Sequence, residues 1–419
     1  MDVICGCLCP HPPLLLPEIG GVQVREVAAT KAAMEEVARL MAKLEPETIV
    51  IISPHAPLLP RGIGVYTDPV LRGDFRQFDQ QELAFSWDND GELAQELLAS
   101  PYYEPLGGNL DYGILVPLAY MLPVNFRVVA LGIGRGSYQE LYEAGGVIRR
   151  AAQRLGRKVL VIASGDLSHR LTPTAPAGYD PLGQVFDEQL LNALCKGDRQ
   201  GILHMDPHLV DRAGQCALRP VSIMLGALGE QEYRGQLLSY EGPFGVGYGV
   251  VTLVVESPPV QLARRSIETY ITTERFLEPP GDFPLTGKAG AFVTIYKDGK
   301  LRGCMGTTGP TEDHVAQEIC VNAVRAATQD PRFPPVVKSE LPHLEISVDV
   351  LGEPQQVGPE ELDPQIYGII VRQGPKAGLL LPAIPGIDRV EDQIAIAKQK
   401  GGIRGDDFIL ERFSVHRYF

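Results

Sequence analysis

The sequence predicts two folded parts: an N-terminal α/β domain with a central, mainly parallel sheet flanked by helices, and a C-terminal α+β domain. Uninterrupted apolar runs bounded by turn residues are typical of strands covered on both faces. Such runs alternate with helical patterns in the first part of the chain, at 48–53, 127–131 and 158–163. A Ser-Pro-Pro sequence at 257–259 ends this alternation, and 419 residues are typical of two domains. We therefore expect one domain at 1–257 and a second at 258–419.

The N-terminal elements follow one another as strand and helix. A strand-like run at 3–8 comes first, and a helix follows at 24–44, where apolar side chains recur about every 3.6 residues. A second helical pattern covers 139–155, and an apolar run at 248–255 predicts the last strand of the domain. Strands that alternate with helices in this way are typical of a parallel sheet.

The C-terminal elements are mixed in character, and for that reason we expect an α+β domain. Helical patterns and strand-like runs occur here without the regular alternation of the first domain. The expected helices lie at 260–273 and 311–329, and the expected strands at 290–296, 344–351 and 368–372.

Composition excludes several classes of protein. There are 38 basic and 52 acidic residues, a net charge of −14, which argues against a general nucleic-acid binder because such proteins need clustered positive charge.

No apolar run is long enough to span a bilayer, so we expect no membrane protein. The N-terminus lacks the basic start of a secretory signal, and the seven cysteines do not form a disulfide pattern, so we expect a cytoplasmic protein. The acidic charge and the size are compatible with a homodimer.

Three histidines follow predicted strands at their carboxyl ends: His11, His55 and His169. In open α/β sheets this edge is where ligands bind. Taken singly, each would more often be a hydrogen-bonded loop residue. Three strands that each deliver an imidazole to one edge favour a functional site.

A carboxylate completes a metal-ligand set. Glu241 follows a strand-like run and is flanked by glycines that allow close backbone approach. Two imidazoles and one carboxylate form the ligand set that holds non-haem Fe(II) and leaves positions open for substrate and dioxygen. Taken alone, Glu241 would more often be a solvated turn residue. The same three ligands would also serve zinc or another divalent metal.

Five short segments together resemble the class III extradiol ring-cleavage dioxygenases of the LigB type, over essentially the whole N-terminal domain. They are Cys-Pro-His-Pro-Pro-Leu-Leu-Leu-Pro at 9–17, Ser-Pro-His at 53–55, Gly-Asp-Leu-Ser-His at 165–169, Leu-Arg-Pro at 218–220 and Glu-Gly at 241–242. The resemblance implies that His11, His55 and Glu241 bind iron and that His169 is the acid–base residue. It implies a catechol, an aminophenol or a related aromatic molecule as substrate, with dioxygen.

Two positions bear on this resemblance. Many members of the superfamily carry Asp-His-Gly where this chain has Tyr112 as the middle residue. A phenol can donate a hydrogen bond, but with an ordinary pKa near ~10 it is a poor proton acceptor, so efficient ring cleavage is less expected. Memo-type relatives often have a cysteine in place of the last ligand, and Glu241 here favours iron ligation instead.

The C-terminal part resembles the AMMECR domain through three segments. They are Leu-Arg-Gly-Cys-Met-Gly-Thr at 301–307, Asp-Pro-Arg-Phe-Pro-Pro at 330–335 and Gly-Leu-Leu-Leu-Pro at 378–382. The glycines of the first segment predict a tight turn that exposes Arg302 and Cys304. Arg302 would hold an anionic ligand or pair with a neighbouring carboxylate. Cys304 would be a nucleophile or modification site or, more commonly for a single cysteine, a buried small side chain.

Three functions follow from these observations. The leading one is an Fe(II)-dependent oxygenase of the extradiol superfamily. The second is a Memo-like metal-binding, redox or maturation protein that works with a radical SAM protein, because the chain resembles the B and A components of the AmmeMemoRadiSam grouping joined in one chain. The third is a metal-dependent hydrolase. A further group, Cys5, Cys7 and Cys9, is expected to be small buried residues packed under a helix and not a metal site.

Overall fold

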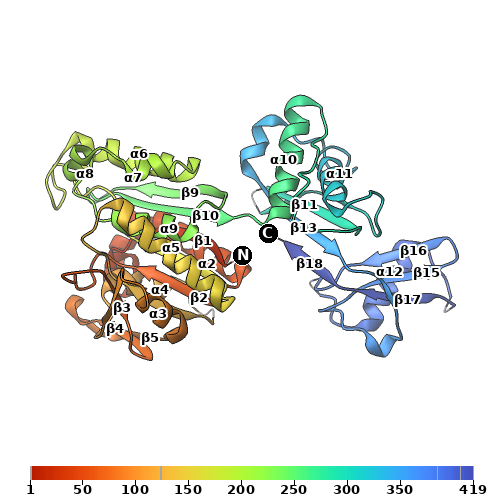
Figure 1. Ribbon diagram of the computed structural model, residues 1–419, viewed down its shortest axis with the longest axis horizontal. Helices are drawn as coiled ribbons and strands as arrows, with labels where there is room; N and C mark the ends of the chain where they lie inside the picture. Colours follow the sequence, from red (N-terminus) through yellow and green to blue (C-terminus); the bar gives the residue numbers. More distant parts are fainter. Residues whose placement is uncertain (1, 123–124, 298, 385, 406, 419) are drawn as a thin grey trace. The chain divides into compact units, whose positions relative to one another are not determined.

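The computed structural model describes residues 2–122, 125–297, 299–384, 386–405 and 407–418. By its internal contacts the chain divides into two units, residues 1–255 and 256–419, a boundary two residues before the one expected from the sequence. In Figure 1 the first unit runs from red to green and the second from green to blue. Within the described residues, no helix combines the length and apolar character needed to cross a membrane.

The first unit is built on an eight-stranded sheet whose strands lie in the order β6-β3-β7-β2-β8-β1-β10-β9. The four central strands β7, β2, β8 and β1 are mutually parallel, and β10 and β9 continue the sheet in antiparallel fashion. The expected mainly parallel sheet is therefore present. The strand bounds are β1 Val3–Cys9, β2 Thr48–Ile52, β3 Ile63–Tyr66, β6 Tyr103–Leu106, β7 Arg127–Leu131, β8 Val159–Ser164, β9 Tyr233–Glu241 and β10 Tyr248–Val255.

Helices cover both faces of this sheet, which explains the uninterrupted apolar runs. Along β2, Val50 and Ile52 belong to one hydrophobic core, whereas Ile49 and Ile51 belong to the other. The first core also contains side chains of α3, α5, α6 and α9, and the second contains side chains of α2 and α4. The helix bounds are α2 Ala28–Leu44, α3 Gly91–Leu98, α4 Tyr112–Tyr120, α5 Tyr138–Leu155, α6 Pro181–Lys196 and α9 Leu218–Leu228.

The three cysteines of β1 are fully buried in the core on the α2 side. Cys5, Cys7 and Cys9 lie in the same hydrophobic cluster as Met34 and Val37 of α2. The sulfur atoms of Cys5 and Cys7 are 3.7 Å apart, and burial raises the pKa of the Cys9 thiol. They are therefore packed under a helix, as expected.

A separate hairpin lies next to α4. It consists of β4 Val70–Phe75 and β5 Gln80–Asp88, which pair with each other in a two-stranded sheet of their own. A short 3-10 turn, Arg76–Phe78, joins the two strands. The ring of Phe78 meets the ring of Tyr112 edge-on, at a centroid distance of 5.6 Å. The hairpin therefore lines the approach to the first residue of α4.

The second unit contains two four-stranded antiparallel sheets, in the orders β12-β11-β13-β18 and β14-β17-β15-β16. Helices α10 Pro258–Thr273 and α11 Val315–Thr328 pack on the first sheet, and α12 Val390–Gly401 packs on the second. The α+β character expected from the sequence is therefore present. The strand bounds are β11 Ala291–Lys297, β12 Lys300–Gly306, β13 Leu344–Leu351, β14 Gln355–Gln356, β15 Gly368–Gln373, β16 Lys376–Leu380, β17 Ile409–Phe413 and β18 Val415–Tyr418.

Candidate metal centre

The loops that carry the three histidines all begin at one edge of the first sheet. His11 follows the end of β1, His55 follows the end of β2 and His169 follows the end of β8. These three strands are neighbours in the order β2-β8-β1 and run parallel. Their carboxyl ends therefore lie side by side, where open α/β sheets bind ligands.

Two of the imidazoles meet directly. The Nε2 atoms of His11 and His55 are 2.9 Å apart, and the ring planes are nearly perpendicular, at 82°. Burial, with a smaller effect of the neighbouring His169, lowers the pKa of His11 to about 3. Burial has the largest effect on His55 and the neighbouring His11 the next largest, and together they lower the pKa of His55 to about 4. Both rings are therefore neutral at physiological pH, the state in which histidine binds a metal ion.

Ser164, the last residue of β8, determines which nitrogen of His11 carries the proton. Its hydroxyl donates to the carbonyl oxygen of Gly113, so its oxygen accepts from the Nδ1 atom of His11 at 2.9 Å. The proton of the neutral ring is then on Nδ1, and the Nε2 lone pair points toward His55. Hydrogen bonds of this kind hold the histidine ligands of metal sites in place.

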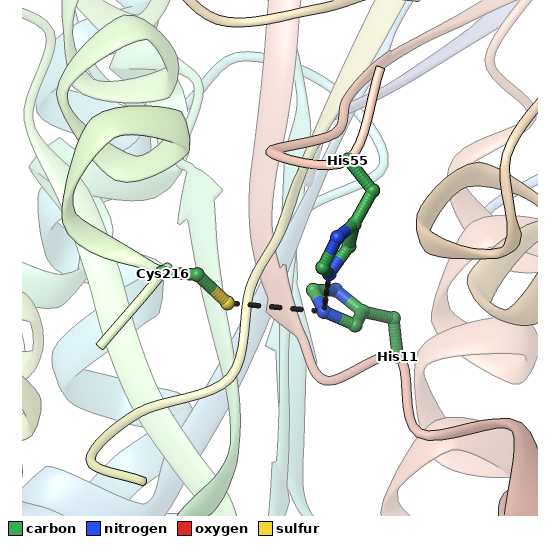
Figure 2. Close-up of side chains that lie close together, drawn as sticks. All are labelled: His11, His55 and Cys216. Atoms are coloured by element: carbon green, nitrogen blue, oxygen red, sulfur yellow. Dashed lines mark hydrogen bonds between the residues drawn. The ribbon is translucent and has the colours of Figure 1, made fainter. Parts of the chain in front are cut away.

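Cys216 supplies the third donor atom. Its sulfur lies 3.8 Å from the Nε2 atom of His11, and the donor atoms of His11, His55 and Cys216 all lie within 4.8 Å of one another. Figure 2 shows the two rings and the sulfur directed toward one another. Nitrogen and sulfur ligands lie about 2.0 to 2.3 Å from a tetrahedral ion, which places such donor atoms about 3 to 4 Å apart. The described side chains therefore fit one transition-metal ion.

Glu241 does not belong to this group, which corrects the expected ligand set. Its Oε1 atom accepts hydrogen bonds from the backbone N–H of Thr30, at 2.7 Å, and from the hydroxyl of Thr30, at 2.5 Å. Thr30 lies in the first turn of α2, where backbone N–H groups have no partner within the helix. A carboxylate at that end is stabilised by the helix dipole. Glu241 is therefore held at the start of α2, and Cys216 is the residue that lies with His11 and His55.

Asp166 is the carboxylate that does lie beside the centre. Its Oδ1 atom accepts the backbone N–H of His11 at 3.0 Å, and its Oδ2 atom lies 3.7 Å from the Nε2 atom of His11. Asp166 is buried, and burial raises its pKa to about 6. In the sequence, Asp166 is one residue of the Gly-Asp-Leu-Ser-His segment at 165–169, and no local pattern distinguishes it as a functional carboxylate.

His169 lies close to the pair of imidazoles. Its charge is one of the causes that lower the pKa values of His11 and His55, and its backbone N–H donates to the carbonyl of Ala213 at 3.2 Å. Its Nε2 atom is buried and has no hydrogen-bond partner among the described residues. A buried nitrogen without a partner is available to a bound molecule. The acid–base role remains a prediction.

Tyr112 covers the exposed side of His55. Its hydroxyl oxygen lies 3.0 Å from Nε2 and 3.2 Å from Nδ1 of that ring. Burial, with smaller effects of Asp166 and Cys216, raises the pKa of Tyr112 to about 12. The phenol is therefore neutral and can donate a hydrogen bond, as expected from the sequence.

A cavity of about 280 Å³ opens beside His55 and Tyr112. The hairpin contributes Asp74, Arg76 and Gln77 to its wall, and the segment 109–112 contributes the rest. Arg76 and Asp74 form a bidentate ion pair there. A small polar molecule could therefore reach the centre past Tyr112.

The C-terminal candidates are engaged with neighbouring groups. Arg302 forms a bidentate ion pair with Glu340, with distances of 3.1 and 2.9 Å, and also donates to the carbonyl of Pro334. Of the two alternatives for Arg302, the structure has the pairing with a neighbouring carboxylate. Cys304 is half-buried on β12, with its sulfur 3.2 Å from the hydroxyl of Thr294 and its N–H bound to Asp330. Its role as a nucleophile remains untested.

Comparison with known proteins covers both units. The model of the family described as "Catalytic LigB subunit of aromatic ring-opening dioxygenase" matches residues 6–251, and that of AMMECR1 matches residues 260–419. The Clostridium acetobutylicum protein CA_C1420 is 36% identical, with 98% of each chain covered. A Thermotoga maritima protein is 49% identical over 40% of this chain and 99% of its own.

The solved structures that are similar to this chain include that of the uncharacterized protein JW3007 from Escherichia coli K12. It aligns with a TM-score of 0.42 and 17% identity, over 59% of this chain and 99% of its own. The family assignment rests on the sequence matches, which cover nearly the whole chain. The chain therefore belongs to the LigB family of aromatic ring-opening dioxygenase catalytic subunits and carries an AMMECR1 domain as its C-terminal part.

Proposed function

We propose that the LigB domain contains a mononuclear redox centre, in which His11, His55 and Cys216 bind one copper ion. The observation that carries this proposal is the convergence of two neutral imidazoles and one thiol within 4.8 Å. A thiolate favours soft ions, and divalent copper heads the affinity order of the first-row metals. Copper bound there would supply one-electron redox chemistry and Lewis acidity.

The surrounding residues support this proposal through what they do to the ligands. Ser164 keeps the Nε2 lone pair of His11 directed at the site. Burial raises the pKa of the Cys216 thiol, so a metal ion must displace its proton, and binding should strengthen as pH rises. The hydroxyl of Tyr112 contacts His55, and both residues line the cavity. These residues form a small centre in which His11 is buried, Cys216 is half-buried and His55 is exposed toward the cavity.

Metal analysis of the Cys216→Ser variant tests the proposal. We expect the wild-type chain, loaded anaerobically with copper, to retain one ion per chain and to show a sulfur-to-copper charge-transfer absorption band in the oxidised state. Cys216→Ser should lose that band and bind copper at least about 10-fold more weakly, because a hydroxyl is a much poorer ligand for a soft ion.

The matched control is Cys195→Ser, since Cys195 is a half-buried cysteine of α6 in the same unit and lies outside the ligand group. It should keep the band and the stoichiometry. A band that persists in Cys216→Ser would contradict the assignment. Zinc retained in the purified protein, with no charge-transfer band after copper is added, would favour a metal-dependent hydrolase instead.

Ring cleavage with Fe(II) is the second candidate, favoured by family membership and by the buried, unpartnered Nε2 atom of His169. Such a nitrogen is suited to take a proton from a bound phenol and to return it. Anaerobic loading with Fe(II), followed by catechols and 2-aminophenols under oxygen, should then give oxygen uptake and coloured ring-opened products. His169→Gln should abolish turnover and leave the bound iron unchanged. Oxygen uptake that is unaffected by His169→Gln would rule out this role.

The fusion to an AMMECR1 domain supports a radical SAM protein as partner, and this remains a proposal, as does the homodimer. Co-purification of the tagged full chain with a radical SAM protein from the same organism would test the first. Sedimentation of the purified chain would test the second.

A further inference from the structure

Asp166 contacts both the segment that carries His11 and the segment that carries Cys216. The Oδ1 atom of Asp166 accepts the backbone N–H of His11 at 3.0 Å. Its backbone carbonyl accepts the N–H of Cys216 at 3.2 Å, and its own N–H donates to the sulfur of Cys216, also at 3.2 Å. Asp166 is separated by 155 residues from His11 and by 50 from Cys216. These three bonds therefore connect parts of the chain that have no local connection.

The backbone of this loop is in direct contact with the Cys216 segment. A Cβ atom added to Gly165 would lie 2.5 Å from the Cα atom of Ala217, a distance that requires one segment to move. Asp166 is 7% exposed, and its Oδ2 atom faces the Nε2 atom of His11 at 3.7 Å. The loop therefore has little freedom to shift relative to the two ligands.

From these contacts we infer that Asp166 is a positioning residue that fixes His11 relative to the Cys216 sulfur and whose carboxylate charge lowers the reduction potential of the bound ion. The inference rests on the proposed function, because it concerns the same centre. The carboxylate holds the backbone of one ligand, and the adjacent peptide group holds the other. The side chain and the main chain of one residue thus act on two different ligands.

The N–H···S bond and the carboxylate act differently on a bound copper ion. Hydrogen bonding to the cysteine sulfur is one of the factors that set the reduction potential of copper–thiolate centres. A negative carboxylate near the ion stabilises the higher oxidation state, so its removal makes the reduction potential more positive. Loss of the contact to the His11 backbone loosens a ligand, which weakens metal binding.

Two substitutions separate the effect of the carboxylate charge from that of the contact with the His11 backbone. Asp166→Asn keeps an oxygen that can accept the N–H of His11 and keeps both backbone bonds to Cys216, but removes the charge. We expect it to retain copper affinity within a few-fold, with a more positive reduction potential. Asp166→Ala removes the anchor of His11, and we expect copper affinity to fall about 10- to 100-fold, as is usual when a residue behind a metal ligand is lost.

The experiment uses the full chain loaded with copper alone. Affinity is measured by competition with a chelator, together with the charge-transfer band and the reduction potential. Glu241→Gln is the matched control, because this carboxylate is bound to Thr30 and not to a ligand segment, and it should leave all three measurements unchanged. Wild-type values in both Asp166 variants would overturn this inference alone. Failure of the wild-type chain to bind copper would overturn the proposed function and this inference together.

Discussion

At the scale of single residues, the chemistry of the candidate centre depends on whether Glu241 or Asp166 is the carboxylate beside His11. The chain places Glu241 at the start of α2 and Asp166 beside His11. Both are acidic residues near glycines and near the ends of strands, so local sequence does not distinguish them. The hydrogen-bond donors around each carboxylate do: Glu241 accepts from Thr30, whereas Asp166 accepts from the His11 backbone.

Replacement of Glu241 by alanine should lower stability without removing metal. The loss of two accepted hydrogen bonds at the start of a helix costs about 1 to 2 kcal/mol. Chemical denaturation of the metal-free protein measures this cost, and metal analysis of the loaded protein should give the wild-type stoichiometry. Loss of metal with unchanged stability would restore Glu241 as a ligand.

The raised pKa of Asp187 predicts that the stability of the protein depends on pH, and a single substitution should remove this dependence. Its buried carboxylate accepts the N–H of Ser168 and the hydroxyl of Tyr240, and burial raises its pKa to about 7. The raised pKa means that the folded state binds the proton more tightly. The resulting stabilisation is present below about pH 4, the ordinary pKa of Asp, and is lost as pH rises to about 7.

Asp187→Asn stays neutral throughout this range. The free energy of unfolding of the wild type minus that of the variant should therefore fall between pH 4 and pH 7, by about 1.4 kcal/mol per unit of pKa difference. Urea unfolding at several pH values measures the difference, with Asp88→Asn, at an exposed aspartate, as control. A difference that does not vary with pH would show that Asp187 is ionised in the folded protein.

At the scale of elements, local patterns in the sequence located the central strands β7, β2, β8 and β1, the strand β10 and the two helices α2 and α5 of the first unit. The helix expected at 139–155 is α5, which begins after a Ser137–Glu140 capping box and ends at Gly156 in the left-handed conformation. The helix expected at 24–44 begins later, at Ala28, because a 3-10 turn occupies the preceding residues. The hairpin of β4 and β5 was not expected, since buried residues alternate with exposed ones along β4 and most of β5 is not buried, so neither strand has an uninterrupted apolar run.

The contact between α5 and α9 depends on glycine at one position of α5 and not at the next. A Cβ atom at Gly145 would lie 2.0 Å from the carbonyl oxygen of Ile223, whereas one at Gly146 would meet only the flexible end of Arg150, at 3.2 Å. We expect Gly145→Ala to destabilise the protein by about 1 to 3 kcal/mol through overpacking. Gly146→Ala should be neutral or stabilising by up to about 1 kcal/mol, because alanine favours helix. Equal melting temperatures for the two variants would contradict this packing.

At the scale of the whole molecule, each unit has hydrophobic clusters of its own. A domain with its own core can unfold as one cooperative unit. The expected outcome in calorimetry of the full chain is two transitions, one for each unit. The variants that identify them must therefore alter a contact within a single unit.

Glu318 provides such a contact in the second unit. Its buried carboxylate accepts hydrogen bonds from both hydroxyl and backbone groups of residues 307–312. Glu318→Gln places an amide N–H₂ against these donors, and we expect a cost of about 1 to 3 kcal/mol. The variant should lower one calorimetric transition and leave the other, which Gly145→Ala lowers, unchanged. A single transition that both variants shift equally would show that the units unfold together.

The sequence by itself determined the two-domain organisation, the parallel sheet and the edge at which the histidines gather. These features follow from local patterns, because apolar periodicity reports burial and parallel strands bring their carboxyl ends together. Only the tertiary structure showed which third donor atom lies beside the two imidazoles. Cys216 has no spacing relation to His11, which lies 205 residues away, and it reaches the centre because the Gly165–Asp166 loop packs against its segment. Glu241 binds instead to an N–H group at the start of α2, a contact between residues 211 positions apart that no local pattern could predict.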